Sequence, residues 1–233
     1  MDFKSDASVS VASASSFAEF DPIGMAADEA IADLRAHRRP RLFVISGPSG
    51  VGKDTVIERL RDVFPDIHFA VTATTRPRRP GEIDGIHYFF LAKEDFAQRL
   101  SSGDFLESAV VYDHRYGVLK SPVQHALNRG QDVVIKVDIQ GAASIRRLAP
   151  NGIFIFLAPE SMSELLQRLK ARKTDDPDIL MERFQAASRE LASANKFDYV
   201  VFNEAEQVES AMDALSAIIQ AERCRIKQPE VSL

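Results

Sequence analysis

The segment Gly47-Pro-Ser-Gly-Val-Gly-Lys53 has the glycine and lysine spacing of a loop that binds nucleotide phosphates. Its glycines allow backbone N–H groups to turn toward one anion, and a helix N-terminus that follows adds partial positive charge. The lysine side chain is long enough to reach the β- and γ-phosphates of a nucleotide. We therefore expect the donor nucleotide to contact Gly47, Pro48, Ser49, Gly50, Val51, Gly52, Lys53 and Asp54.

Asp54 occupies the position where such loops usually carry Ser or Thr, whose hydroxyl holds Mg²⁺. An uncompensated carboxylate there would repel a triphosphate by about 3 kcal/mol, at a separation of ~5 Å and an effective dielectric constant of ~20. A cation must therefore offset its charge. We expect that cation to be Mg²⁺, held by Asp54 directly or through a water, or a basic side chain, or both.

A second candidate anion site follows in the segment Thr72-Ala-Thr-Thr-Arg-Pro-Arg-Arg-Pro-Gly-Glu82. It places three arginines within four residues, held by two prolines, which restrict the backbone. Guanidinium groups suit phosphate because they bind two of its oxygens at once. Taken alone, the segment also fits a solvated basic loop. Beside a phosphate loop it favours a kinase whose acceptor is itself phosphorylated.

The elements that must position these two segments alternate between strands and helices. Short apolar runs predict buried strands at residues 41–46, 68–72, 132–137, 152–157 and 199–202. Helical spacing predicts helices at residues 56–64, 122–128, 178–195 and 207–225. Residues 72–118 have the pattern of a small β-rich insertion with one helix near 93–100. The order predicts an α/β fold with a parallel five-stranded core sheet and helices on both faces.

Composition narrows the functional classes. The chain has 233 residues, of which 45% are hydrophobic and 27% charged, as in ordinary globular proteins. Its net charge of -5 argues against a nucleic-acid polymer as partner, and no apolar run suggests a membrane span. We expect residues 1–40 to be an extension, disordered to about residue 24 and helical from 26 to 37.

Several motifs in the same order resemble guanylate kinases, chiefly the bacterial and plastid members. They include Thr74-Thr-Arg-Pro-Arg-Arg-Pro-Gly-Glu82, Asp84-Gly-Ile-His-Tyr-Phe-Phe90, Val137-Asp-Ile-Gln-Gly141 and Phe197-Asp-Tyr-Val-Val-Phe-Asn203. The resemblance implies a P-loop nucleoside-monophosphate-kinase fold. Its parts would be a core (residues 41–71, 119–158 and 179–233), a GMP-binding subdomain (72–118) and a helical lid (159–178). The implied reaction is Mg²⁺-dependent phosphorylation of GMP or dGMP by ATP.

The resemblance also implies which residues bind the acceptor, and these are Thr72, Arg76, Arg79, Tyr88, Glu107, Tyr116 and Asp138. A carboxylate such as Glu107 suits guanine, because it can accept hydrogen bonds from N1–H and the 2-amino group together. The alternatives are a surface charge for Glu107 and packing roles for the two tyrosines. Asn203 is expected at the adenine pocket, although capping of a strand end is an equal possibility for it and an alternative for Asp138.

The lid carries the remaining cations. Ser161-Met-Ser-Glu164 has the pattern of a capping box, which begins a helix. Arg168 and Arg172 are four residues apart on that helix, and Arg183 lies on the next one. The simpler interpretation is two solvated helix faces. The resemblance instead implies that these arginines act with Lys53 in catalysis, stabilising the charge that spreads over the transferred phosphoryl group.

Two positions depart from the family pattern. Val118 follows Tyr116-Gly117 where many members have Ser or Thr touching guanine, so one base contact is lost or comes from backbone or water. Lys136 stands on the predicted strand 132–137 where many members have an acidic residue. We hypothesise that Lys136 pairs with Asp54, which keeps a negative group for a Mg²⁺-bound water and limits phosphate repulsion. A Lys136 unrelated to Asp54 is the alternative.

Two other functions share these features. One is a non-catalytic guanylate-kinase-like module that binds partner peptides, although such modules typically lose the phosphate-loop lysine and the lid arginines. The other is a P-loop kinase with a different phosphorylated acceptor. The expected partners are ATP and GMP or dGMP, for a monomer or homodimer. The expected location is the cytoplasm, with a plastid as the alternative.

Overall fold

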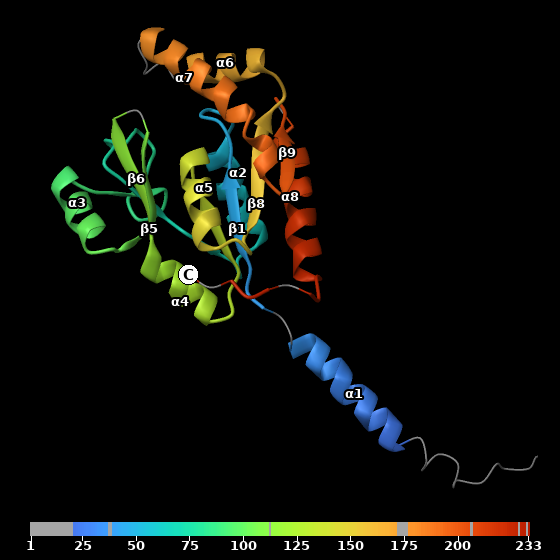
Figure 1. Cartoon of the computed structure of the whole chain (residues 1–233). Helices are drawn as coiled ribbons and strands as arrows, with labels where there is room; N and C mark the ends of the chain where they lie inside the picture. Colours follow the sequence, from blue (N-terminus) through green and yellow to red (C-terminus); the bar gives the residue numbers. More distant parts are fainter. Residues whose placement is uncertain are drawn as a thin grey trace, which may run out of the picture. The chain divides into compact units, whose positions relative to one another are not determined.

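Figure 1 shows the computed structural model, which describes residues 21–36, 39–111, 113–171, 177–205, 207–227, 229–231 and 233. The chain divides into two units, Met1–Arg38 and Arg39–Leu233. In the first unit, helix α1 (Asp21–Ala36) begins at Asp21, so our expectation of disorder to about residue 24 is wrong for its first turn. An acidic residue and a proline are both favoured at a helix start, and Asp21-Pro22 supplies them. The predicted extension at 1–20 lies outside the described residues.

The core of the second unit is a parallel sheet in the order β2 (His68–Phe69), β7 (Val133–Lys136), β1 (Leu42–Ser46), β8 (Ile153–Pro159), β9 (Tyr199–Asn203). Val44 on the central strand lies opposite Ile135 on one side and Phe154 on the other. The predicted five-stranded parallel sheet is confirmed. Because the strands are parallel, their carboxyl ends meet at one edge, where ligands bind in folds of this kind.

Helices cover both faces of this sheet, as predicted (Figure 1). Helices α2 (Lys53–Val63) and α8 (Val208–Arg223) pack on the face that carries Phe43 and Ile45. Helices α4 (Lys120–Asn128) and α5 (Ile139–Leu148) pack on the face that carries Leu42 and Val44. All four strand residues are fully buried, which explains why the sequence of β1 shows a continuous apolar run instead of alternation.

A second, four-stranded sheet lies beside the core in the order β4 (Tyr88–Phe90), β3 (Thr72–Thr74), β6 (His114–Leu119), β5 (Phe105–Val111) (Figure 1). Helix α3 (Lys93–Ser101) packs on it, with the Phe96 and Phe105 rings 4.4 Å apart. The single strand predicted at 68–72 is therefore wrong. Phe69 pairs with β7 in the core sheet, whereas Thr72 already pairs with Val118 in the second sheet.

Helices α6 (Met162–Ala171) and α7 (Pro177–Leu191) form a hairpin at the upper end of the view in Figure 1. The Ser161 hydroxyl accepts a hydrogen bond from the Glu164 N–H at 3.1 Å, as the capping pattern predicts. Leu165, Leu169 and Ala187 are buried in a small cluster of their own, apart from the two main cores. The hairpin thus has little apolar contact with the sheet, which suits a segment that moves.

In the second unit, two helix boundaries differ by three residues or more from those predicted. Helix α2 begins at Lys53 instead of residue 56, because Gly52, with φ of 98°, turns the chain from the loop straight into the helix. The apolar spacing used for prediction starts only at Val56. The helix predicted at 178–195 ends at Leu191 and a short 3₁₀ helix (Ala194–Lys196) follows. Within the described ranges, no helix has the length and apolar content to cross a bilayer.

Candidate active site

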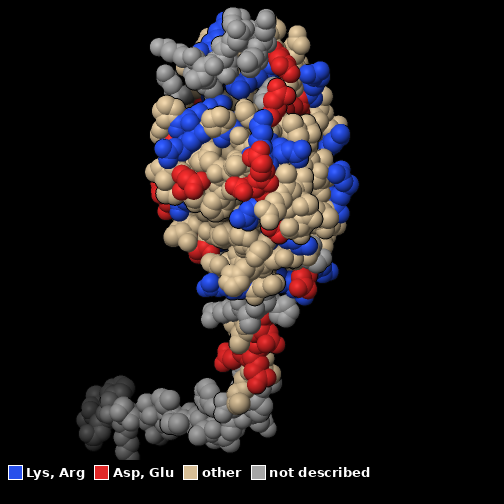
Figure 2. All heavy atoms as spheres, turned by 90° about the vertical axis from the view of Figure 1, so that its left-hand side faces the viewer, with Lys and Arg blue, Asp and Glu red and all other residues tan. Residues whose placement is uncertain are grey.

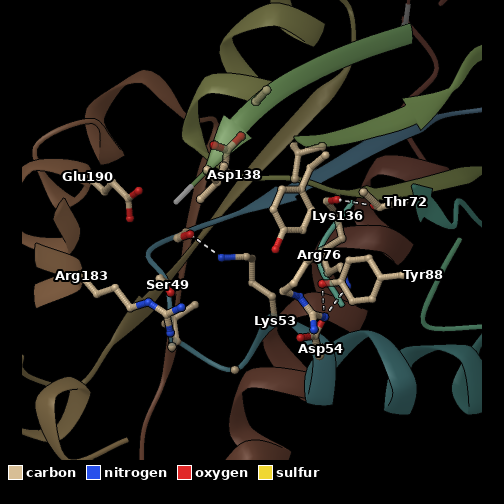
Figure 3. A pocket seen from close by; sticks show the side chains of 18 of the residues that line it. Ser49, Lys53, Asp54, Thr72, Arg76, Tyr88, Lys136, Asp138, Arg183 and Glu190 are labelled. Carbon is tan, nitrogen blue, oxygen red and sulfur yellow. Dashed lines mark hydrogen bonds and ion pairs between the residues drawn. The ribbon is translucent and has the colours of Figure 1, made fainter. Parts of the chain in front are cut away.

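One pocket opens at the carboxyl edge of the core sheet and reaches the second sheet (Figure 3). The predicted site residues that line it are Gly47, Ser49, Gly50, Val51, Gly52, Lys53, Asp54, Thr72, Arg76, Arg79, Tyr88, Glu107, Tyr116, Asp138 and Arg183. Pro48, Arg168 and Asn203 do not line this pocket, and Arg172 lies outside the described residues. Two predicted anion sites that are distant in sequence therefore face one cavity.

The phosphate loop connects β1 to α2 and depends on its glycines for its close approach to neighbouring strands. A Cβ atom on Gly47 would lie 2.2 Å from the Leu157 carbonyl oxygen. Lys53 folds back along the loop, where its Nζ donates to the carbonyl oxygens of Gly47 at 2.5 Å and Pro48 at 3.1 Å. Burial lowers the pKa of Lys53, while Glu190 and other nearby carboxylates raise it. The lysine is thus held among acceptors that a phosphate can replace.

The hypothesised ion pair between Asp54 and Lys136 is present, since Lys136 Nζ contacts Asp54 Oδ1. The Lys136 side chain is only 13% exposed, against 50% for Asp54. Lys136 Nζ also donates to the Tyr88 hydroxyl at 3.1 Å, and that hydroxyl donates to Asp54 Oδ1 at 3.3 Å. Burial alone would lower the pKa of Lys136, but Tyr88 and Asp54 raise it above its usual range. Lys136 is therefore a cation at neutral pH.

Arg76 and Arg79 are held in place by Glu82, a residue to which we assigned no role. Arg76 Nη2 donates to Glu82 Oε1 at 2.6 Å, and its Nη1 to the Pro77 carbonyl oxygen at 2.7 Å. The Arg79 N–H donates to Glu82 Oε2 at 2.7 Å. Burial would raise the pKa of Glu82, yet its bonds with Arg76 and Arg79 lower it overall. The ionised carboxylate fixes the arginine loop and orients the Arg76 guanidinium.

The far end of the pocket carries a buried acid. Glu107 is 7% exposed, and its Oε2 has no hydrogen-bond partner within the described part of the chain. Burial, and secondarily Asp138, raise the pKa of Glu107 to about 8, although the Val118 N–H lowers it. Gly141 makes room for this carboxylate, because a Cβ there would lie 2.8 Å from Glu107 Oε2. A buried acceptor without a partner is ready to receive a ligand donor.

Asp138 and Thr72 have structural bonds as well as places in the pocket. The Asp138 carboxylate caps α5 by accepting from the Gly141 N–H at 2.8 Å, and burial raises the pKa of Asp138. Asp138 thus caps the helix that follows β7, whereas our alternative was capping of a strand end, and it also lines the pocket. The Thr72 hydroxyl donates to the Lys136 carbonyl oxygen at 3.3 Å, which ties the second sheet to β7.

Arg168 and Asn203 line a separate depression on the outer side of the phosphate loop. Arg168 donates to the carbonyl oxygens of Val51 at 3.0 Å and Asn203 at 2.9 Å, and it forms an ion pair with Glu164. The Asn203 amide donates to the Val51 carbonyl oxygen at 2.7 Å. The two side chains therefore join the hairpin and the end of β9 to the loop.

Glu190 is a pocket residue that the sequence analysis missed. It lies on α7, seven residues after Arg183, so both face the pocket from the same side of the helix (Figure 3). Burial raises the pKa of Glu190, while Lys53 and the Ser49 N–H lower it. Helical spacing from Arg183 was the available signal, but the helix was predicted without reference to the loop that it faces.

A phosphate loop, a facing arginine-bearing sheet and a hairpin with further arginines define a P-loop phosphotransferase that acts on nucleotides. The guanylate kinase family pattern matches residues 39–222. A Clostridium perfringens guanylate kinase is 44% identical over 200 residues, covering 86% of this chain and 92% of that protein. A rice protein named guanylate kinase 2, chloroplastic/mitochondrial, is 43% identical over a stretch that covers 84% of this chain and 69% of that protein. The guanylate kinase crystal structure from Anaplasma phagocytophilum has a TM-score of 0.64 at 29% identity, and the match covers 81% of this chain and 90% of that one. This chain belongs to the guanylate kinase family.

Proposed function

We propose that this protein transfers the γ-phosphoryl group of ATP to GMP, giving ADP and GDP. The observation that carries the proposal is one pocket lined by the phosphate loop, by Arg76 and Arg79, and by the buried Glu107. A mononucleotide of guanine offers an anion to the arginines and paired donors to the carboxylate. The same contacts serve dGMP, because they go to the phosphate and the base.

The parts of the chain divide the work. The proposed acceptor subdomain is residues 72–118, which hold nearly all of the four-stranded sheet. The proposed lid is residues 159–178, which hold α6 and the start of α7. Residues 41–71, 119–158 and 179–233 form the proposed core. The small separate core of the hairpin supports a lid, because few apolar contacts oppose its movement.

Transfer itself needs positioning and charge more than covalent chemistry. Arg76, Arg79, Tyr88 and Tyr116 would hold the acceptor phosphate, whose oxygen is already nucleophilic near neutral pH. Lys53 would exchange its loop carbonyls for the β- and γ-phosphate oxygens of the donor. Arg183 lines the pocket, and Arg168 is tied to the outer face of the loop. With Arg172, as the resemblance implies, they would stabilise the charge that develops on the phosphoryl oxygens.

Base selection would come from Glu107. Its ionised carboxylate accepts from guanine N1–H and the 2-amino group, a pattern that adenine does not offer. Val118 is fully buried, and its N–H hydrogen-bonds the Glu107 carboxylate, so this backbone group helps to orient the acid that would accept from the base. The wrong base would leave a buried carboxylate without a partner, which costs about 1–3 kcal/mol or more.

Mg²⁺ is the proposed cofactor, arriving with ATP. Among the described residues no cluster of three or more His, Cys, Asp or Glu could hold a metal ion alone. A single half-exposed carboxylate beside the loop, Asp54, fits a Mg²⁺ bound mainly by phosphates and waters. Bound there, Mg²⁺ would neutralise charge on the β- and γ-phosphates.

The distribution of surface charge also favours small-molecule partners. Lys and Arg are interspersed with Asp and Glu on the face shown in Figure 2, instead of forming one basic field suited to a nucleic-acid polymer. The cytoplasm remains the proposed location and is supported by bacterial relatives such as that from Clostridium perfringens.

The test is an ADP-formation assay with Mg·ATP and a panel of GMP, dGMP, AMP, UMP and CMP. We expect turnover with GMP and dGMP only. A preference for AMP, or ADP formation that does not depend on any acceptor, would overturn the assignment. A matched pair of variants, Arg76→Met in the pocket and Arg78→Met on its exposed neighbour, separates acceptor binding from general charge. Only the first should lose GMP turnover.

A further inference from the structure

Three side chains from three elements meet between the two proposed substrate sites (Figure 3). Asp54 lies in the first turn of α2, Lys136 ends β7, and Tyr88 begins β4 in the second sheet. Lys136 Nζ contacts Asp54 Oδ1 and lies 3.1 Å from the Tyr88 hydroxyl and 4.3 Å from the centre of the Tyr88 ring. Asp54 therefore belongs to the donor side, Tyr88 to the acceptor side, and Lys136 touches both.

The Tyr88 hydroxyl has one proton, and here that proton is directed to Asp54 Oδ1 at 3.3 Å. Its oxygen meanwhile accepts from Lys136. A phosphate dianion has no proton to donate, so it can bind Tyr88 only by accepting the hydroxyl proton. Tyr88 can therefore serve Asp54 or an acceptor phosphate at one time, but not both.

We propose that Asp54, Lys136 and Tyr88 form a relay that couples acceptor binding to donor binding, with Lys136 as its positioning residue. The inference rests on the proposed function, because it takes Tyr88 as a ligand of the acceptor phosphate. When that phosphate takes the Tyr88 hydroxyl, Asp54 loses a donor and keeps Lys136. The Asp54 carboxylate can then accept a replacement hydrogen bond on the donor side, from a water bound to Mg²⁺.

This exchange gives the coupling a sign that depends on the metal. With Mg²⁺ present, release of Asp54 favours the Mg²⁺-loaded triphosphate, so acceptor and donor strengthen each other's binding. Without Mg²⁺, the same released carboxylate faces a bare triphosphate and repels it. Lys136 limits this repulsion because its ammonium group stays within contact of Asp54. A merely structural ion pair between β7 and α2 would give neither dependence.

The test measures binding, so that turnover does not enter. Calorimetry gives the Kd of a non-hydrolysable β,γ-imido analogue of ATP, with and without saturating GMP, in Mg²⁺ and in EDTA. For the unmodified protein we expect GMP to tighten analogue binding about tenfold in Mg²⁺, within the usual range of coupling between sites. In EDTA the same GMP should leave the analogue Kd unchanged or weaken it.

Closure of a lid could also couple the two sites, so matched tyrosine variants isolate the relay. Tyr88→Phe keeps the ring beside Lys136 but removes the hydroxyl proton. Tyr116→Phe removes the hydroxyl of another tyrosine that lines the pocket, and the centres of the Tyr116 and Tyr88 rings are 6.2 Å apart. Both should weaken GMP binding. Only Tyr88→Phe should reduce the Mg²⁺-dependent tightening to about one- to twofold, while Tyr116→Phe keeps it near tenfold.

Lys136→Met tests the positioning residue, with Lys93→Met on the exposed start of α3 as its control. We expect Lys136→Met to weaken analogue binding most strongly in EDTA, where no Mg²⁺ helps to offset the charge of Asp54. The relay is wrong if the unmodified protein shows no tightening in Mg²⁺, or if Tyr88→Phe keeps it. If GMP does not bind the unmodified protein at all, or AMP binds better, the proposed function itself fails.

Discussion

Replacement of the buried acid at the far end of the pocket tests how this protein reads guanine. Glu107→Gln keeps the shape of the side chain but exchanges one accepting oxygen for an NH₂ group. The pKa of Glu107 is about 8 in the folded protein, raised first by burial and then by Asp138. Without nucleotide, the carboxyl group is therefore mostly protonated at pH 7, although guanine needs it ionised.

The size of the pH effect follows from that pKa. About a tenth of the protein has Glu107 ionised at pH 7 and about three quarters at pH 8.5, and apparent affinity scales with the competent fraction. The Kd for GMP should thus fall roughly eightfold over this range. The Glu107→Gln variant should bind GMP about 5- to 150-fold more weakly at pH 8.5, because its NH₂ group faces a guanine donor. The affinity of this variant for GMP should not rise with pH as that of the unmodified protein does.

Titration calorimetry with GMP from pH 6.5 to 8.5 decides the matter, with Arg78→Met as a control of unchanged pH dependence. An affinity of the unmodified protein that is flat or falls with pH would refute the reasoning. So would a Glu107→Gln variant that retains the rise.

Stability supplies an independent check of the same group. The folded pKa of Glu107 lies above its ordinary value near 4.5, so the folded state binds more protons between pH 4.5 and 8. Its contribution to the free energy of unfolding is complete below pH 4.5 and is lost as pH rises through 8, by at most about 1.4 kcal/mol per pH unit. Urea unfolding should therefore show that the free energy of unfolding of Glu107→Gln rises, relative to that of the unmodified protein, between pH 5.5 and 8.

Three further substitutions probe separate parts of the site. Glu82→Gln should raise the KM for GMP about tenfold and leave the KM for ATP unchanged, since it removes a charged bond worth about 1.5–3 kcal/mol from the Arg76 guanidinium. A variant whose KM for GMP equals that of the unmodified protein would contradict this. Glu190→Gln removes a negative charge near the donor phosphates, so the KM for ATP should fall about threefold, and a rise would count against it. Gly52→Ala should lower the free energy of unfolding by about 1–3 kcal/mol, because φ is 98° and the new Cβ would lie 2.5 Å from Asn203 Nδ2; an unchanged urea midpoint would disprove the strain.

The core sheet could be predicted because its sequence signals are local. Leu42, Phe43, Val44 and Ile45 are buried on both faces of the sheet, so a continuous apolar run was enough to place β1. The phosphate loop was equally readable from glycine and lysine spacing. The Asp54–Lys136 pair could also be anticipated, because both residues depart from the family pattern at positions that lie beside each other in such folds.

The second sheet was harder because its contacts are not local. The sequence pattern placed the start of the insertion at residue 72, but the predicted core strand was carried on to the same residue. The pairing partners of Thr72, which are Tyr88 and Val118, are distant in sequence and could not correct this. The role of Glu82 as the anchor of Arg76 was missed for a different reason. A glutamate after Pro-Gly has the composition of an exposed turn, and only the folded loop returns it to the guanidinium at 2.6 Å.

Four cations in or beside the pocket are held by acceptors of the protein itself. The pairs are Arg76 with Glu82, Lys136 with Asp54, Arg168 with Glu164, and Lys53 with the Gly47 and Pro48 carbonyls. Substrate phosphates therefore enter by exchange of hydrogen bonds, and the net gain is smaller than that of a phosphate meeting an unpaired cation. In return, each cation is oriented before the substrate arrives, so less side-chain entropy is lost on binding. Exchange also links the sites, because each carboxylate that a phosphate displaces must find a new donor.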